Sequence, residues 1–106
     1  MYRVAQGRQY GKTLPETGYT ERYVIIYRAV AKGVTTINNM DYVTRSQKFA
    51  NEHAEHMANT EEEDQVVLYA MVKAKDVAEA YNPGEYFYIG DIVNGRVTYE
   101  AKYENF

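Results

Sequence analysis

The sequence predicts an α+β fold in which one main helix accompanies a mostly antiparallel sheet of about five strands. Residues 23–30, YVIIYRAV, form an apolar run rich in β-branched residues, which is typical of a buried strand. Residues 44–59 place apolar residues at helical spacing instead. Near the end of the chain, Asn94-Gly95 separates two strand-like segments and is a strong hairpin signal. These patterns together favour a helix combined with a sheet.

The length of the chain sets its domain organisation. A chain of 106 residues suits a single domain, residues 1–106, with a modest hydrophobic core. Residues 1–20 contain three glycines and one proline and show no clear period. We therefore expect an irregular arm at residues 1–20, with a short strand at Tyr2–Ala5.

The central part of the chain gives the most distinct elements. The run at 23–30 is nearly continuous in apolar residues, which predicts a central strand buried on both faces. A loop then leads into a short strand around Tyr42–Thr44. The helix follows, and Thr44 with Gln47 fits a capping box, while Ser46 is a second possible cap.

The predicted helix has one apolar stripe, and an acidic loop tip at residues 61–64 follows it. The residues of the stripe are Phe49, Ala50, His53, Ala54 and Met57.

The last third of the chain predicts three more strands. Residues 65–74 form the first, and residues 75–84 form a short helical turn that Asp76 caps and Pro83-Gly84 ends. Residues 85–93 and 96–103 are the two strands of the expected hairpin. Apolar and polar residues alternate in the second of these, so one of its faces should be buried.

Composition excludes several classes of function. The net charge of −3 and the isoelectric point near 5.4 argue against a nucleic-acid binder, which needs a basic surface. The absence of cysteine excludes disulfides and thiolate chemistry. The first residues lack the apolar stretch of a signal peptide, and no apolar run approaches the length of a membrane span, so we expect a cytoplasmic protein without membrane contact.

Tyrosine is the unusual residue, with 12 copies and no tryptophan. Many of these residues suit half-buried strand positions, and such a number also raises the prospect of an aromatic binding surface.

Two short motifs imitate known sites. GRQYGKT at residues 7–13 resembles a phosphate-binding loop, but its spacing is one residue short and Pro15 and Gly18 interrupt the helix that should follow. His53 and His56 lie three residues apart on the helix and lack a clear third ligand from another element, so we expect no metal site.

A third set of residues is spread along the chain. Arg28 interrupts an apolar strand, which costs free energy unless the guanidinium is paired or binds a ligand. Thr44 and Ser46 lie at a junction between strand and helix, and Glu85 follows a Pro-Gly turn. Arg28 could equally form an internal ion pair or face solvent, so the pattern alone leaves its role open.

The order of these segments resembles the ADP-ribosyltransferase fold, and in particular the small transferase-like domains of phage and mobile-element proteins. The segments that carry the resemblance are IYRAV, DYVTRSQKFANEHA, VVLYAMVKAKDV and NPGEYFYIG, within residues 23–90. The resemblance lies in their shared order and spacing.

The resemblance implies NAD as the substrate and a role for each matching residue. Arg28 would bind the phosphates or the ribose next to nicotinamide through its planar fork of donors. Thr44 and Ser46 would support the nicotinamide pocket. Glu85 would be the catalytic acid, which holds a ribose hydroxyl and stabilises the positive charge that develops as nicotinamide leaves. Tyr42 and Phe49 are the candidates for an aromatic ring that stacks on nicotinamide.

Two functions therefore stay open. The first is an NAD-dependent mono-ADP-ribosyltransferase that modifies a host protein, and the resemblance implies a phage-encoded one. The second is a catalytically inactive transferase-like inhibitor that binds and blocks a host defence or toxin protein. Pro83 stands where arginine-modifying members have Glu or Gln, which argues against an arginine acceptor. A structural or assembly protein is a third option, and nothing in the sequence sets the oligomeric state.

Overall fold

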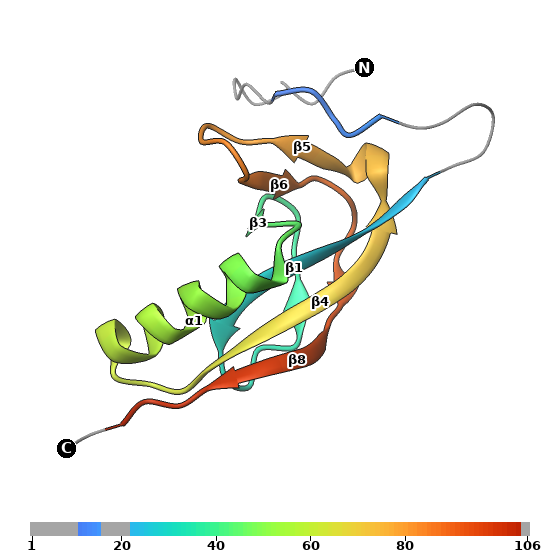
Figure 1. Cartoon of the computed structure of the whole chain (residues 1–106). Coiled ribbons are helices and arrows are strands. Elements are labelled where there is room, and N and C mark those ends of the chain that lie inside the picture. The colour runs from blue at the N-terminus through green and yellow to red at the C-terminus, as the bar shows by residue number, and fades with distance from the viewer. Residues whose placement is uncertain (1–10, 16–21, 105–106) are drawn as a thin grey trace.

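The computed structural model describes residues 11–15 and 22–104, and these form one α-helix, one short 3-10 helix and eight strands (Figure 1). The predicted α+β class with mostly antiparallel pairing is confirmed. In chain order the elements are β1 (Tyr23–Ala31), β2 (Thr36–Ile37), β3 (Tyr42–Val43), α1 (Gln47–Glu61), β4 (Gln65–Lys73), η2 (Ala74–Asp76), β5 (Val77–Glu79), β6 (Tyr86–Tyr88), β7 (Val93–Asn94) and β8 (Arg96–Ala101).

The strands form three small sheets, whereas the sequence predicted one sheet of about five strands. The sheets have the strand orders β1-β4-β8, β2-β7 and β3-β6-β5, and every pair is antiparallel. An isolated bridge between Tyr27 and Thr44 joins the first sheet to the end of β3. Five of the eight strands have only two or three residues, which is too short for them to join the β1-β4-β8 sheet as full-length members.

The longest pairing joins β1 to β4 over nine residues, from Tyr23 opposite Lys73 to Ala31 opposite Gln65. Strand β4 lies in the centre of this sheet, so the prediction that residues 23–30 form the central strand is wrong. Burial alternates along the first half of β1, because Val24 and Ile26 are buried while Ile25 is 41% exposed. The apolar run therefore has one core face and one open face.

The hairpin predicted at Asn94-Gly95 does not form. Asn94 pairs with Thr36 in the sheet β2-β7, while the next strand, β8, pairs with β4. A Cβ atom at Gly95 would lie 2.9 Å from the Cβ atom of Leu68, so the chain passes too close to β4 for a side chain here. Asn94-Gly95 thus marks a change of sheet. Burial of β8 is also less regular than predicted, since Val97 is 58% exposed and a register shift opposite Val67 and Leu68 interrupts the alternation.

Helix α1 begins two residues later than the capping box predicted. Ser46 is the N-cap, and its hydroxyl oxygen accepts a hydrogen bond from the backbone N–H of Phe49 at 3.1 Å. The Thr44 hydroxyl oxygen instead accepts from the backbone N–H of Ser46. At the other end, Glu62 ends the helix with a left-handed backbone, φ 55°, so the acidic run 61–64 starts inside the helix rather than as a loop.

The buried face of α1 consists of alanines. Ala50, Ala54 and Ala58 recur every four residues and pack on Val67 and Ala101 of the sheet. The predicted stripe also contained Phe49 and His53, and both are exposed. Small side chains let the helix approach the sheet closely, and α1 covers the part of the β1-β4-β8 sheet that lies toward the C-terminus (Figure 1).

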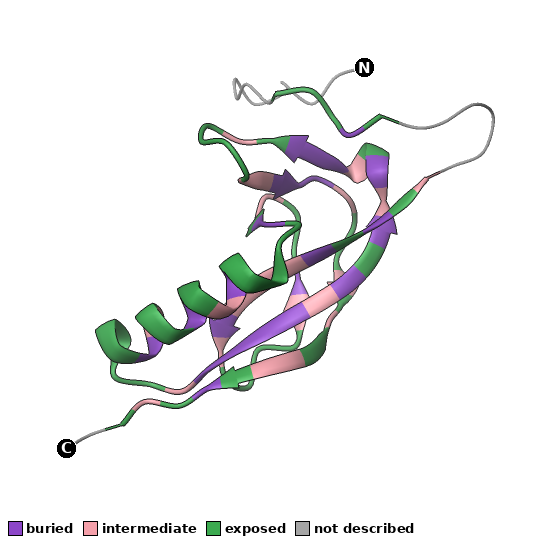
Figure 2. Ribbon diagram, in the orientation of Figure 1, coloured by how far each residue is buried: buried purple, intermediate pink, exposed green. Residues whose placement is uncertain are grey.

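The main core lies on the other face of the β1-β4-β8 sheet, where the two smaller sheets cover it (Figure 2). Its most buried side chains include Ile26, Ile37, Leu68 and Val77, which come from β1, β2, β4 and β5. One core thus connects all three sheets.

Two further expectations changed in detail. The helical turn predicted at residues 75–84 is limited to η2, and residues 77–79 continue as β5. Residues 11–15 of the expected irregular arm run along β5, where Gly11 and Leu14 donate backbone hydrogen bonds to Glu79 and Val77. The rest of that arm, including the strand predicted at Tyr2–Ala5, lies outside the described residues.

We predict that larger side chains on the alanine face of α1 destabilise the fold. Ala54→Leu should lower the free energy of unfolding by about 1–3 kcal/mol, because a fully buried position against the sheet has no room for three more carbons. Urea unfolding followed by circular dichroism measures the change. The exposed helix position Glu52→Leu is the control, and an equal loss there would contradict close packing as the cause.

We predict that the Tyr88 hydroxyl makes the folded chain less stable at alkaline pH. This hydroxyl donates a hydrogen bond to the carbonyl of Asp91, and burial, together with Asp76 and Asp91, raises its pKa. The unfolded chain therefore loses this proton first, at a pH of about 10, and stability present below that pH falls as the pH rises further. Tyr88→Phe should remove the part of this loss of stability that comes from the hydroxyl. It should also lower the free energy of unfolding by about 1 kcal/mol at neutral pH.

Melting temperatures between neutral pH and about pH 11 test this account. Tyr81→Phe, at an exposed ring, should change neither the neutral value nor the alkaline slope. An unchanged alkaline slope in Tyr88→Phe would rule out this hydroxyl as the source.

Candidate functional site

The residues singled out in the sequence meet at one cleft, where β1, β3, the start of α1 and the loop before β6 come together. It encloses about 170 Å³. Five of the six predicted site residues line it, although they are spread from position 28 to position 85, and Ser46 is the one that does not. The lining residues are Tyr27, Arg28, Ala29, Tyr42, Val43, Thr44, Phe49, Ala50, His53 and Glu85.

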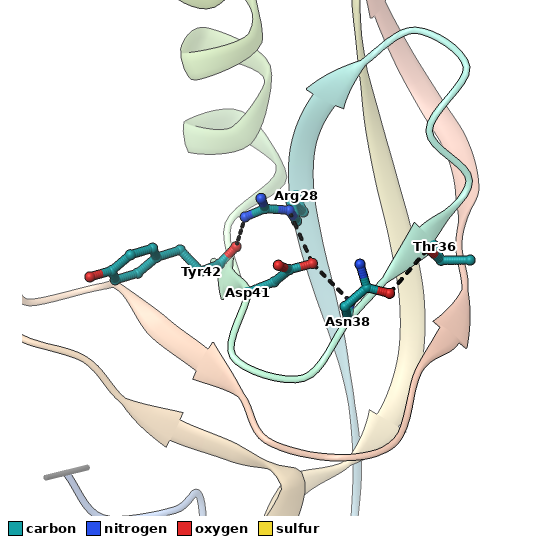
Figure 3. Close-up of polar contacts among 5 residues, drawn as sticks. All are labelled: Arg28, Thr36, Asn38, Asp41 and Tyr42. Carbon is teal, nitrogen blue, oxygen red and sulfur yellow. Dashed lines mark hydrogen bonds and ion pairs between the residues drawn. The ribbon is translucent and has the colours of Figure 1, made fainter. Parts of the chain in front are cut away.

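Arg28 is held by a small polar network (Figure 3). Its Nη1 donates a hydrogen bond to the backbone carbonyl of Tyr42 at 2.8 Å, and its Nε lies 3.4 Å from Oδ2 of Asp41. The guanidinium carries five N–H donors, so three remain for a ligand after these two contacts. The internal ion pair considered for Arg28 does form, and the side chain, 30% exposed, still lines the cleft.

The same network shapes the loop between β2 and β3. Oδ2 of Asp41 accepts a hydrogen bond from the backbone N–H of Asn38 at 2.8 Å, and Oδ1 of Asn38 accepts from the hydroxyl of Thr36 at 3.2 Å (Figure 3). The backbone of Asp41 also bonds to Tyr88 of β6. Arg28 therefore ties β1 to the loop that carries Tyr42 and, through that loop, to the strand that follows Glu85.

The side chains of Thr44 and Ser46 form local hydrogen bonds, whereas the backbone of Thr44 bonds to β1. The backbone N–H and C=O of Thr44 both bond to Tyr27, which fixes the end of β3 against β1. The Thr44 side chain is buried within the cleft lining, and its oxygen accepts from the backbone of Ser46. The Ser46 oxygen caps α1, so its observed contact is with the helix N-terminus rather than with the cleft.

Glu85 comes from a tight turn. Its backbone N–H donates to the carbonyl of Asn82 at 3.1 Å, and Gly84 within the turn has φ +83°, a conformation that favours glycine. Oε1 of Glu85 accepts a hydrogen bond from the side-chain amide of Asn82 at 3.1 Å. The turn thus holds Glu85, a half-buried residue, at the border between the cleft and another hollow formed by residues 79–86.

Aromatic rings line the cleft from two elements. The Tyr42 ring packs on Phe87, with centroids 4.7 Å apart, and the Phe49 ring lies parallel to the His53 ring at 6.4 Å. Tyr42 and Phe49 are each about half exposed, at 49% and 48%, so part of each ring is open to solvent. Phe49 is therefore not a plain core residue, which the sequence had left open.

His53 and Tyr27 also line the cleft, and neither was predicted from the sequence as a site residue. His53 follows Phe49 by one helical turn, so the spacing from Phe49 could have pointed to it. Tyr27 precedes Arg28 and reaches the cleft because β1 is an edge strand of its sheet.

A second hollow of about 430 Å³ lies on the other side of Arg28 and Ala29. Its lining includes the carboxylates of Asp41, Glu61 and Glu63. Arg28 therefore lines two hollows, and each of them also contains at least one acidic residue.

Other kinds of site are not evident in the part of the chain that the structure describes. Residues 11–15 and 22–104 contain no group of three or more His, Asp or Glu side chains that could hold a metal ion. Within the same ranges, no helix has the length and hydropathy to cross a membrane. The phosphate-loop-like segment at 7–13 lies mostly outside the described residues, and Gly11 to Thr13 pair with β5.

Comparisons of the chain with models of protein families, with curated proteins and with solved structures gave no match. The case for a function therefore depends on the cleft itself.

The Arg28 network predicts a measurable contribution to stability. Asp41→Asn keeps the shape of the side chain but removes its charge, which weakens both the contact with Arg28 and the acceptance from Asn38. We expect a loss of about 1–2 kcal/mol in the free energy of unfolding, measured by urea titration.

The exposed ion pair between Lys32 and Glu100 is the matched comparison. Glu100→Gln should cost less than about 0.5 kcal/mol, because exposed ion pairs contribute little. If Asp41→Asn lowered the free energy of unfolding no more than Glu100→Gln does, the contact between Arg28 and Asp41 would not be what fixes the loop between β2 and β3.

Proposed function

We propose that this protein binds NAD in the cleft between Arg28 and Glu85 and acts as an NAD-dependent mono-ADP-ribosyltransferase on a protein. The observation that carries the proposal is the convergence of Arg28, Thr44 and Glu85 on one cleft, in the order that the transferase resemblance implies. Their positions are 57 residues apart at the extremes (85 − 28), so neighbourhood along the chain does not explain their meeting.

The size of the cleft favours one end of the dinucleotide. An enclosed volume of about 170 Å³ lies below the range of roughly 300–1,000 Å³ typical for whole drug-sized ligands. It suits a single ring, so nicotinamide would enter between the aromatic residues Tyr42 and Phe49. The remainder of NAD would lie along the open surface, with the free N–H groups of Arg28 donating to a phosphate or ribose oxygen.

In this proposal Glu85 acts on the bond between nicotinamide and ribose. That bond breaks with its electron pair leaving on nicotinamide, and positive charge develops on the ribose. A fixed carboxylate stabilises this charge and accepts a hydrogen bond from a ribose hydroxyl. A nucleophile of the acceptor protein then bonds to the same ribose carbon, and its proton passes to water.

The second candidate is an inactive relative that binds and blocks a host defence or toxin protein. Two observations favour it: two N–H groups of Arg28 already contact Asp41 and Tyr42, and the enclosed volume is small. In that case the cleft is a remnant, and the exposed aromatic side chains serve a protein interface.

Transfer of labelled ADP-ribose from NAD in host-cell lysate distinguishes the two. The wild-type protein should label a host protein, and Glu85→Gln should lower the initial rate by about 100-fold or more, because it removes a charge aimed at the transition state. Glu52→Gln, at an exposed helix position, is the matched control and should label at the wild-type rate.

Thermal unfolding with NAD supports the same test. A ligand that binds only the folded chain raises the melting temperature, so NAD should stabilise both the wild type and Glu85→Gln. The enzyme proposal would be contradicted if NAD neither labelled a host protein nor raised the melting temperature. If the protein then also formed a stable complex with a host protein, the inhibitor would be favoured.

A further inference from the structure

Helix α1 covers only part of its face of the β1-β4-β8 sheet. The alanines of the helix pack on Val67 and Ala101, and the helix begins beside Tyr27, where Phe49 and Ala50 share the cleft with it. Strands β1 and β4 continue past this level to Tyr23 and Lys73. Figure 1 shows both strands extending beyond the helix toward the start of β1.

The part of this face without a helix is apolar and exposed. The register places Tyr23, Ile25 and Tyr27 of β1 on one face with Tyr69 and Met71 of β4, and we call these five residues the open sheet face. Met71 is 67% exposed, Tyr23 52% and Ile25 41%, while the buried Val24 lies between the two exposed residues of β1 and buried residues flank Met71 in β4 (Figure 2). Contiguous apolar surface of this kind typically marks an interaction site.

The rings of the open sheet face connect it to the cleft. Tyr27 and Tyr69 are half-buried neighbours, with centroids 6.4 Å apart, and Tyr27 also lines the cleft beside Phe49. Tyrosine is a preferred interface residue because it is large and amphipathic and loses little entropy on binding.

Among the described residues, two cations lie on the open sheet face, although the chain as a whole carries −3, and the carboxylate of Glu55 lies on the same side of the sheet, bonded to Tyr99. Arg96 lies opposite Tyr69 and Lys73 lies opposite Tyr23, so both cations share this face. The nearby first turn of α1 contains no acidic residue, and its helix N-terminus adds partial positive charge. The carboxylates at residues 61–64 lie at the other end of the helix.

We propose that the open sheet face is a docking surface for a partner protein, through a segment that carries aliphatic or aromatic side chains flanked by carboxylates. The apolar residues would supply the buried contact, and Arg96 with Lys73 would select acidic flanks. A second copy placed face to face would bring like cations together, so the charge pattern disfavours a symmetric dimer. This inference does not depend on NAD binding.

Selection from a random peptide library on the full-length chain tests the proposal. Enriched peptides should combine aromatic or aliphatic residues with Asp or Glu, and their affinity, measured by fluorescence polarisation, should fall with rising salt. Met71→Glu should weaken binding about tenfold or more, because it places a carboxylate in the apolar contact. Arg96→Glu should weaken binding as well and reduce the dependence on salt.

Val97→Glu is the matched control. Val97 is a similarly exposed apolar residue of the same sheet, at 58%, and it pairs with Leu68 on the opposite face. Its binding should equal that of the wild type, and circular dichroism confirms that each variant is folded. Peptides that bind Met71→Glu as well as wild type would overturn the proposal. So would a dimer in sedimentation that Met71→Glu dissociates, since the occupant would then be a second copy.

Discussion

The contact of the Arg28 guanidinium with Asp41 and with the carbonyl of Tyr42 is the constraint on which the cleft depends. An arginine in an apolar strand must be compensated, and here Asp41 of the loop between β2 and β3 and the carbonyl of Tyr42 at the start of β3 supply the acceptors. In return, the loop is fixed against β1 and against Tyr88 of β6. Three short sheets that could have packed in other ways are therefore joined at one place, and the cleft lies at that junction.

The alanine face of α1 sets the second boundary of the site. Because Ala50, Ala54 and Ala58 let the helix lie close to the sheet, Phe49 and His53 are displaced from the core to the cleft and the surface. The Ser46 cap determines where the helix begins and therefore where the Phe49 ring lies. The helix also leaves Ile25 and Met71 uncovered, so the cleft and the open sheet face follow from the same packing.

The sequence predicted the helix and the long strands better than it predicted the sheets. Helical periodicity located α1, and residues 65–74 were expected as the strand that became β4. Arg28, Thr44 and Glu85, which the transferase resemblance named, line one cleft, and their roles stay a prediction. The sequence could not show that the chain passes from one sheet to another at Asn94-Gly95. That change depends on the close approach of Gly95 to Leu68, which is far away in the sequence. Nor could the sequence identify the acceptors of Arg28, since Asp41 and Tyr42 resemble ordinary loop and strand residues until the loop folds onto β1.

The central claim is that the cleft between Arg28 and Glu85 holds the nicotinamide end of NAD. Titration of isotope-labelled protein with NAD, followed residue by residue by nuclear magnetic resonance, tests it most directly. The account predicts saturable changes in the backbone signals of Thr44, Phe49 and Glu85, and much weaker changes in Arg28→Gln, which lacks the positive charge and the planar fork of donors for ribose or phosphate. Absence of change at millimolar NAD, or saturable changes confined to residues outside the cleft, would contradict it.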